Sequence, residues 1–222
     1  MSEAGDLENI EKSILSTGIR VGTPVKTKFM TSFITKATPE GLYIIDIKKT
    51  LSRIQTAAKF INRAEIDKVI VCSGREYATT PIEKFCEVTG ATKMLGRFMP
   101  GTLTNPLLPY YIEPQLVIIS DPQTDAQAVL EATNAGIPVI GLSNTDNVTS
   151  KIDLIIPANN RGRKSLATTY WLLAREVLIQ KGQLKDGGSM KYEIDDFETK
   201  ITEEELEEEP VKNTRFDRYQ RQ

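Results

Sequence analysis

The chain has 222 residues, which is enough for one large α/β domain with extensions at its ends. Its hydrophobic content of 40% supports a buried core, and no apolar run approaches the roughly 20 residues that a membrane-spanning helix needs. The sequence contains no histidine, so it lacks the commonest general base and the commonest zinc ligand. We expect Cys72 and Cys86, which have no metal-ligand spacing, to be buried reduced thiols. Metalloenzymes and Ser-His-Asp hydrolases are therefore disfavoured.

The formal net charge of −2 is unevenly distributed. Residues 183–222 hold 7 Lys+Arg and 12 Asp+Glu, a net of −5, whereas residues 1–182 hold the other 21 and 18, a net of +3. The second part has few apolar residues, which is typical of disordered segments. The sequence therefore predicts a single, mildly basic domain over 1–182 and an acidic, disordered tail over 183–222.

The first 36 residues read as an N-terminal helix and a basic extension. The acidic N-terminus lacks the apolar stretch of a secretory signal, so we expect a cytoplasmic protein. Apolar residues share one face of a predicted short helix over Asp6–Thr17, and a basic loop follows over Arg20–Lys28. Next, the runs Phe33–Thr35 and Leu42–Ile45 flank a turn and predict a β-hairpin.

Two strands and two helices are predicted between the hairpin and residue 95. A helix over Asp46–Ala64 has an apolar face, and its polar face begins with Lys48 and Lys49. A strand over Lys68–Cys72 precedes a helix that ends at Gly90. A further short strand covers Ala91–Leu95.

The segment Gly96–Pro114 has no periodicity. A loop of this length in a compact domain is usually functional or disordered. We expect it to be ordered, because it carries side chains that can anchor it, namely Phe98, Met99, Leu103, Leu107, Tyr110 and Tyr111.

The centre of the chain reads as strand, helix, strand. Leu116–Ile119 is apolar at every position and Ile137–Leu142 nearly so, as in strands buried on both faces. Between them, apolar spacing places Ala126, Val129, Leu130 and Thr133 on one helical face. Such a unit is a right-handed crossover joining parallel strands.

A last strand over Asp153–Ile156, a basic turn over Asn159–Lys164 and a helix over Ser165–Lys181 complete the domain. Strands that alternate with helices predict a three-layer α/β/α sandwich around a mainly parallel, five-stranded sheet. In such sheets, binding residues gather in the loops at the carboxyl ends of the strands.

Those loops permit an enzymatic interpretation. Asp46, Asp121 and Asp146 each follow a strand and could together hold Mg²⁺, although helix caps and turns explain Asp46 and Asp121 more simply. The Ser73–Glu76 turn could bind a phosphate at a helix N-terminus. Neither a GxGxxG motif nor a P-loop follows any strand. An enzyme acting on a small phosphorylated ligand is therefore the alternative function.

Basic side chains in loops and at element ends favour nucleic acid instead. Such residues reach phosphates, and Gly- and Pro-shaped loops on a rigid domain suit folded RNA recognised by shape and backbone. The candidates are Arg20, Lys26, Lys28, Lys48, Lys49, Arg97, Arg161, Arg163 and Lys164.

The sequence also carries a family resemblance. Gly96–Pro106, Gly-Arg-Phe-Met-Pro-Gly-Thr-Leu-Thr-Asn-Pro, resembles the signature loop of the universal small-subunit ribosomal protein two family, which includes the laminin-receptor-precursor (p40) branch. Further blocks that resemble the family are Gly41–Thr50, Leu116–Asp121, Ala135–Leu142, Ser143–Asp146, Ile152–Asn160 and Ser165–Glu176. The bacterial helical-hairpin insertion is missing and the tail is short, so the chain resembles an archaeal-type member.

The resemblance implies a flavodoxin-like fold and a non-catalytic, structural role in translation. It implies contacts with small-subunit rRNA and neighbouring ribosomal proteins near the junction of head, body and platform, in a cytoplasmic, ribosome-bound protein. No cofactor, metal, membrane or small-molecule substrate is implied. RNA contact is expected at Arg97, Thr102, Thr104 and Asn105. A third possibility, an extracellular binding module, is disfavoured by the missing secretory signal.

Overall fold

A computed structural model describes residues 16–184, 188 and 190–200 of the chain. The predicted helix over residues 6–17 falls outside this part except at its last two positions, and residues 201–222 fall outside it as well. No helix within the described residues is long and apolar enough to cross a bilayer.

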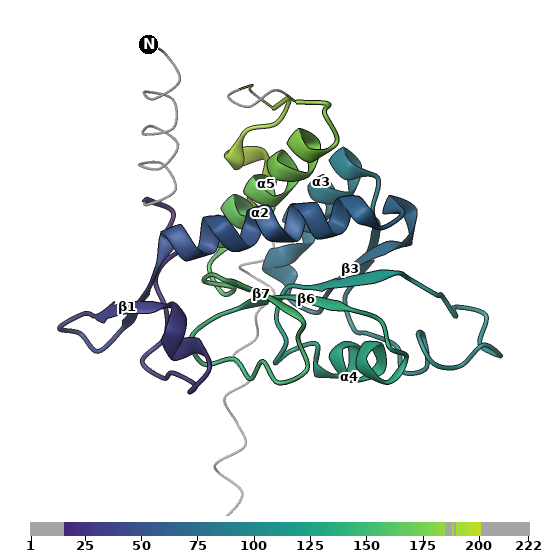
Figure 1. Ribbon diagram of the computed structural model, residues 1–222, viewed down its shortest axis with the longest axis horizontal. Helices are drawn as coiled ribbons and strands as arrows, with labels where there is room; N and C mark the ends of the chain where they lie inside the picture. Colours follow the sequence, from purple (N-terminus) through teal and green to yellow (C-terminus); the bar gives the residue numbers. More distant parts are fainter. Residues whose placement is uncertain (1–15, 185–187, 189, 201–222) are drawn as a thin grey trace, which may run out of the picture.

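A parallel sheet of five strands forms the centre of the fold, with the order β4-β3-β5-β6-β7 (Figure 1). Numbered along the chain within this sheet, the order is 2-1-3-4-5, which is the flavodoxin-like arrangement. The β5–α4–β6 unit joins neighbouring parallel strands, as predicted. The strands are β3 (Val69–Ser73), β4 (Thr92–Leu95), β5 (Leu116–Ile119), β6 (Val139–Ser143) and β7 (Leu154–Pro157).

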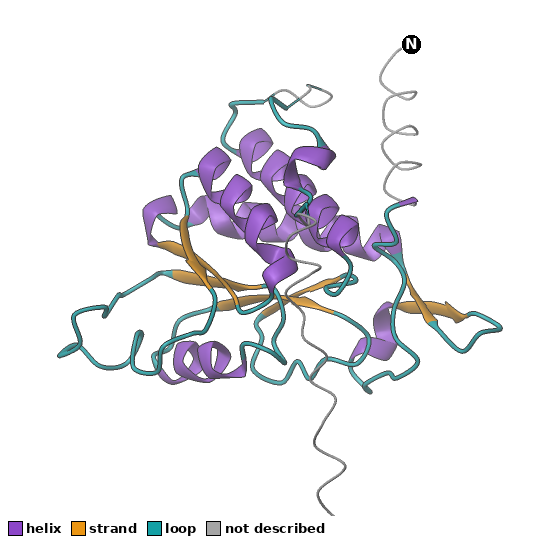
Figure 2. Ribbon diagram, turned by 180° about the vertical axis from the view of Figure 1, so that it is seen from behind, coloured by secondary structure: helices purple, strands orange, loops and turns teal. Residues whose placement is uncertain are grey.

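Helices cover both faces of the sheet, which confirms the three-layer prediction (Figure 2). On one face α5 (Arg163–Gln180) packs against α2 (Ile47–Arg63) and α3 (Thr79–Thr89). On the other face lies α4 (Ala126–Asn134). Short 3₁₀ turns, η2 (Ile66–Lys68) and η3 (Glu76–Ala78), flank β3. Every residue of β3, β5, β6 and β7 is buried, because helices shield both sides of the sheet.

The prediction that both cysteines are buried is confirmed. Cys72 in β3 and Cys86 in α3 are both free and buried. Burial raises the pKa of each thiol to about 12, so neither forms a thiolate near neutral pH.

Of the face predicted for α4, only Val129 is buried, and Ala126, Leu130 and Thr133 are exposed. Leu130 remains 38% exposed, whereas Glu131 is buried beside Ala128 and Ala132. The Glu131 carboxylate accepts hydrogen bonds from Gly101 N at 2.8 Å and Leu103 N at 3.3 Å, in the loop after β4. A buried charge is tolerated when hydrogen bonds replace its lost hydration. Helix α4 is therefore oriented with Glu131, and not Leu130, toward the loop after β4.

The anchors predicted for the loop Gly96–Pro114 are only partly correct. Phe98 and Leu103 are buried, as expected, in the core between the sheet and α4. Met99, Leu107 and Tyr110 are exposed, so they do not anchor the loop. The loop projects at the end of the molecule opposite to the β-hairpin (Figure 1).

The predicted hairpin is confirmed as an antiparallel pair, β1 (Ile34–Ala37) with β2 (Tyr43–Ile45), preceded by the 3₁₀ turn η1 (Met30–Phe33). It leads directly into α2, whose N-cap is Asp46. The Asp46 carboxylate accepts from Lys48 N at 3.0 Å, which satisfies one free backbone donor of the first turn.

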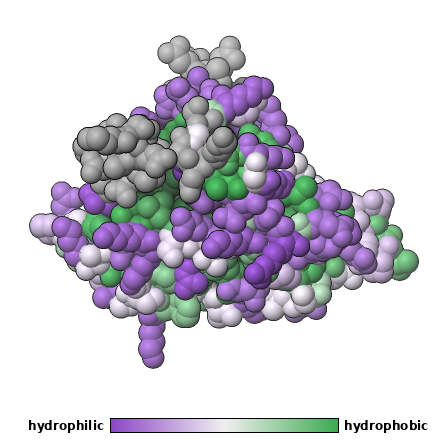
Figure 3. Space-filling view, turned by 45° about the horizontal axis from the view of Figure 1, so that its top comes forward, coloured by the Kyte–Doolittle hydropathy of each residue, from purple (hydrophilic) through white to green (hydrophobic). Residues whose placement is uncertain are grey.

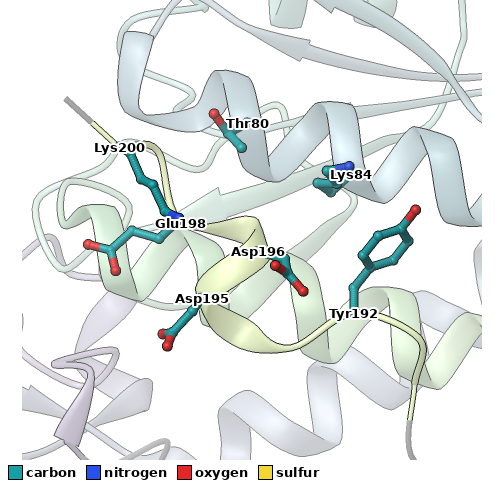
Figure 4. A pocket seen from close by; sticks show the side chains of 7 residues that line it. All are labelled: Thr80, Lys84, Tyr192, Asp195, Asp196, Glu198 and Lys200. Carbon is teal, nitrogen blue, oxygen red and sulfur yellow. The ribbon is translucent and has the colours of Figure 1, made fainter. Parts of the chain in front are cut away.

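The tail does not begin at Gln183 as predicted, because residues 190–200 pack onto α3 and α5. This segment contains the 3₁₀ turn η4 (Ile194–Phe197), and Phe197 is fully buried in the main core. The Trp171 indole donates to Tyr192 O at 2.9 Å. A pocket beside α3 is lined by the segment's charged side chains and by Lys84 (Figure 4). We call residues 190–200 the C-terminal strap.

We expect Phe197→Ala to detach the strap and to lower the free energy of unfolding by about 3–5 kcal/mol, since it empties a fully buried aromatic site. Thermal unfolding followed by circular dichroism measures the loss. Substituting the strap's exposed Asp195 with Asn is the control, which we expect to change stability by less than about 0.5 kcal/mol. Equal effects of the two substitutions would show that the strap does not contribute to the core.

Candidate nucleic-acid interface

The predicted basic extension lies along the fold between the hairpin and the loop after β6. Thr27 N donates to Thr145 O at 2.9 Å, and the Thr23 and Thr145 hydroxyls lie 2.9 Å apart. At Gly22 a side chain could not fit, because a Cβ would lie 2.8 Å from Tyr43 O and 2.5 Å from Thr145 Cγ2. The extension is therefore fixed along its length rather than loosely attached.

Five of the predicted contact residues gather where this extension meets the hairpin and the start of α2. Arg20 O accepts from Ile45 N at 2.8 Å, and the Lys26 ammonium lies 4.8 Å from the centre of the Tyr43 ring. The Lys49 ammonium donates to Ser32 O, next to the turn that follows Lys28. All five side chains belong to exposed residues: Arg20, Lys26, Lys28, Lys48 and Lys49.

Arg161 belongs to the same region. Its guanidinium forms an ion pair with Asp146, in the loop that holds the basic extension. We call Arg20, Lys26, Lys28, Lys48, Lys49 and Arg161 the basic end of the molecule. Arg163 lies apart, with its guanidinium 5.8 Å from the centre of the Tyr77 ring, and Lys164 is exposed beside it.

The structure separates the signature loop from the basic end. Arg97, Thr104 and Asn105 are exposed in this loop, on the opposite side of the molecule (Figure 1). Thr102 is different, because it is buried and its hydroxyl donates to Met99 O at 2.6 Å. The Thr102 side chain is therefore turned into the loop and away from solvent.

The carboxyl ends of the central strands are filled by a polar network around Asp121, for which the sequence predicted a turn or a shared Mg²⁺ site but no such network. Its buried carboxylate is ion-paired with Arg75 and accepts from Thr124 Oγ1 at 2.7 Å. It also accepts from Asn147 Nδ2 at 3.0 Å and Asn160 Nδ2 at 3.3 Å. These donors follow β3, β5, β6 and β7, so the network closes the edge where flavodoxin-like folds bind ligands.

The possible Mg²⁺ site is not assembled. Asp46 caps α2, Asp121 is held by its network, and Asp146 pairs with Arg161. Within the described residues, no group of three or more acidic or cysteine side chains is placed to hold a metal ion. The simpler interpretation of Asp46 and Asp121 as cap and turn residues is confirmed.

Asp125 lies beside this network and is almost fully buried. Its Oδ1 accepts from Gly74 N at 2.9 Å, while Oδ2 has no partner. Burial, followed by the nearby Asp121 charge, raises the pKa of Asp125 to about 6, and the Gly74 N–H and Arg75 oppose that rise.

We expect Asp125→Asn to remove a pH dependence of stability. A raised pKa means that the folded state binds the proton more tightly, so stability is full below the unfolded pKa of about 3.9. It falls as the pH rises to about 6, where the buried carboxyl ionises. Urea unfolding between pH 4 and 8 should show this decline in the parent chain and a flatter profile in the variant. An equal decline in both proteins would contradict the assignment.

The fold and surface together define a class of protein. This is a flavodoxin-like domain whose ligand edge is filled by its own polar side chains, and whose exposed cations lie on the loops and the helix start around that edge. This geometry favours contacts made by surface side chains over binding in a crevice at the strand ends.

Comparison with known proteins gives the family. The family model for ribosomal protein S2 matches residues 14–107 and 110–179, so the chain belongs to the ribosomal protein S2 family. A relative from Nitrosopumilus maritimus, named small ribosomal subunit protein uS2, is 70% identical over 93% of this chain and 100% of its own length. A protein of the same name from Cenarchaeum symbiosum is 56% identical over 90% of this chain and 96% of its own. A third protein of this name, from Thermofilum pendens, is 51% identical over 84% of this chain and 87% of its own length. Similarity to these archaeal proteins confirms the predicted archaeal type.

Proposed function

We propose that this chain is a structural constituent of the small ribosomal subunit, where it binds rRNA and neighbouring ribosomal proteins near the junction of head, body and platform. Its membership of the ribosomal protein S2 family is the observation that carries the proposal. In translation it acts as a ribosome-bound, cytoplasmic component without catalysis.

Electrostatic contact with folded rRNA is the proposed mechanism. The basic end supplies ammonium and guanidinium groups that neutralise phosphates, and Arg163 and Lys164 add a second contact. In the signature loop, Arg97 provides charge, and the side chains of Thr104 and Asn105 provide hydrogen bonds. Thr102 supports this loop from its buried position.

The alternative function, an enzyme acting on a small phosphorylated ligand, would need an open crevice at the strand ends. The Asp121–Arg75 pair and its amide partners occupy that edge. These observations support the ribosomal role over the enzymatic one.

Sedimentation of a native cell extract through a density gradient tests the proposal. At low monovalent salt we expect the chain to migrate with the small ribosomal subunit, and high salt should release it, because phosphate neutralisation displaces counterions. A chain that stays at the top of the gradient at low salt would overturn the structural role.

The acidic stretch at residues 203–209 is not suited to phosphate binding. We expect deletion of residues 201–222 to leave rRNA affinity unchanged or to raise it slightly, because the deletion removes net negative charge. Filter binding to transcribed small-subunit rRNA measures this, with the full chain as control. A clear loss of affinity would mean that the tail itself contacts RNA.

A further inference from the structure

We propose that the tip of the signature loop binds a protein and not RNA. We define the apolar tip as the three exposed apolar side chains of this loop, Met99, Leu107 and Tyr110, and its partner is a neighbouring protein that offers an uncharged, apolar pocket. The inference rests on the proposed ribosomal role, and it reassigns this part of a loop that the sequence suggested for RNA.

The composition of the tip is the first argument. The sequence has no Lys, Arg, Asp or Glu from Phe98 to Ile112. Within this stretch Leu107 is 91% exposed, Met99 52% and Tyr110 40%. Hydrophobic atoms lie at the end of the molecule where the loop projects (Figure 3). Single exposed apolar residues are ordinary, but three on one uncharged loop indicate an interaction surface.

The second argument is that the loop is held in shape before it binds anything. The Glu131 carboxylate accepts from Gly101 N and Leu103 N, and Ile112 N donates to Thr102 O at 3.0 Å. Asn105 Oδ1 accepts from Leu107 N at 3.1 Å, which fixes the backbone directly beneath the exposed leucine. A rigid loop loses little conformational entropy on association, so its exposed side chains are effective anchors.

Gly101 completes this support. Its φ of +91° lies in the region that favours glycine, and a Cβ there would lie 2.6 Å from Leu108 Cδ1. Leu108 therefore packs inward over Gly101, while its neighbour Leu107 points to solvent. Of these two adjacent leucines, Leu108 therefore belongs to the interior of the loop and Leu107 to its exposed surface.

The chemistry of the tip selects the partner. Phosphates require cations or hydrogen-bond donors, and within the tip only the Tyr110 hydroxyl is a donor, because leucine and methionine side chains offer none. A second copy of this chain is disfavoured by area, since three side chains fall well short of the roughly 800 Å² per partner of a stable interface. A pocket on a protein already held nearby by the same subunit needs no such area, because common tethering raises the effective concentration.

Photo-crosslinking inside assembled subunits tests the proposal. Leu107 is replaced by p-benzoyl-phenylalanine in the full chain, the chain is expressed in archaeal cells, and the small-subunit fraction is irradiated. We expect a crosslink to one ribosomal protein at an apolar residue. The same replacement at Lys48, in the basic end, should crosslink to rRNA. Crosslinks from Leu107 only to rRNA or to a second copy, or no crosslink, would overturn the proposal.

Matched variants give a second readout. In small subunits washed with increasing salt, we expect Leu107→Ser to weaken retention by about tenfold, since burial of one leucine changes an association constant by at least that much. Leu107→Met, which keeps an apolar side chain, should be retained like the parent chain. Binding of the free chain to transcribed rRNA should be unchanged in both variants.

These outcomes separate the two proposals. If the parent chain does not migrate with the small subunit, the ribosomal role fails and the docking proposal fails with it. If the chain does migrate there but Leu107→Ser is retained as well as Leu107→Met, only the docking proposal is overturned. A loss of rRNA binding by free Leu107→Ser would assign the tip to RNA instead.

Discussion

Asp121→Ala is expected to lower the free energy of unfolding by about 3–5 kcal/mol, because it leaves the Arg75 guanidinium without its buried partner. For a domain of this size, such a loss corresponds to a fall in Tm of about 10 °C. The substitution also deprives the Thr124 hydroxyl and the amides of Asn147 and Asn160 of an acceptor. Each buried donor left unsatisfied adds to the cost.

The pH dependence of this effect has a definite sign. Burial alone would raise the pKa of Asp121, but the Thr124 hydroxyl, the Gln123 N–H and Arg75 outweigh it and hold the pKa below its usual value. A carboxyl with a lowered pKa contributes stability that is present above the unfolded pKa of about 3.9. That contribution is lost as the pH falls through the lower, folded pKa. The parent and Asp121→Ala should therefore approach each other in stability only under acid conditions.

Urea unfolding at pH 7 and at pH 3 measures both effects. Arg75→Ala is the partner variant, and a double-mutant cycle gives the coupling between the two side chains. We expect a clear coupling energy, because removing the second partner costs little once the first is gone. Asp46→Ala, which removes a half-buried helix cap, is the control and should cost only about 1 kcal/mol. Equal losses for Asp121 and Asp46 would mean that the buried network does not hold the strand ends together.

This network shows where sequence reasoning was insufficient. Asp121-Pro122 has the form of a turn, and a turn residue needs no distant partner. The signal was present in the polar residues that follow β3, β6 and β7, namely Arg75, Asn147 and Asn160. Their convergence depends on the strand order β3-β5-β6-β7, which brings these loops to one edge. The pattern of apolar residues predicts the strands but not their order, which only the family resemblance implied through its flavodoxin-like fold.

The buried strands were predictable for a simple reason. β5 is apolar at every position, and only a strand covered on both faces requires that pattern. The orientation of α4 was not predictable, because the energy of Glu131 depends on two N–H groups of the signature loop, some 30 residues away. The spacing of apolar residues within a helix carries no information on hydrogen bonds to a distant loop, so it could not predict that Glu131 is buried.

The C-terminal strap was missed because its composition resembles disorder. Acidic residues dominate Glu193–Glu198, and the attachment depends on a few apolar side chains, chiefly the fully buried Phe197 together with Tyr192 and Ile194. The candidate binding residues were predictable as a set, since charge and loop position are visible in the sequence. Their division between the basic end and the signature loop required the fold (Figure 1).

The position of two lysines adds a physical argument for the basic end. Lys48 and Lys49 occupy the first turn of α2, which holds no acidic residue. The positive end of the helix dipole disfavours cations there, so these lysines do not serve the stability of the helix. Their placement is explained if Lys48 and Lys49 face phosphates of rRNA in the proposed ribosomal complex.

The combined replacement of Lys26, Lys28, Lys48 and Lys49 by Gln is expected to weaken binding to small-subunit rRNA by about a hundredfold. Each lost phosphate contact also lowers the slope of log affinity against log salt by about 1, so the slope should fall by about 4. Filter binding of the purified chain to transcribed rRNA at several salt concentrations measures both quantities. Removing Lys48 and Lys49 relieves an unfavourable interaction with the helix dipole, while the Lys49–Ser32 hydrogen bond and the Lys26–Tyr43 contact are lost, so the stability of the variant should stay within about 1 kcal/mol of the parent.

The matched control uses cations at the other end of the same helix. Lys59 and Arg63 are exposed on α2, but they lie beyond the basic end. Their replacement by Gln should leave the affinity within about threefold and lower the salt slope by less than 1, since distant charges contribute only screened, long-range attraction. If both variants lost affinity equally, the net charge of the domain would control binding and the basic end would not be a defined contact surface. A large loss confined to the four-lysine variant, with stability preserved, would assign these lysines to phosphate contact independently of the fold.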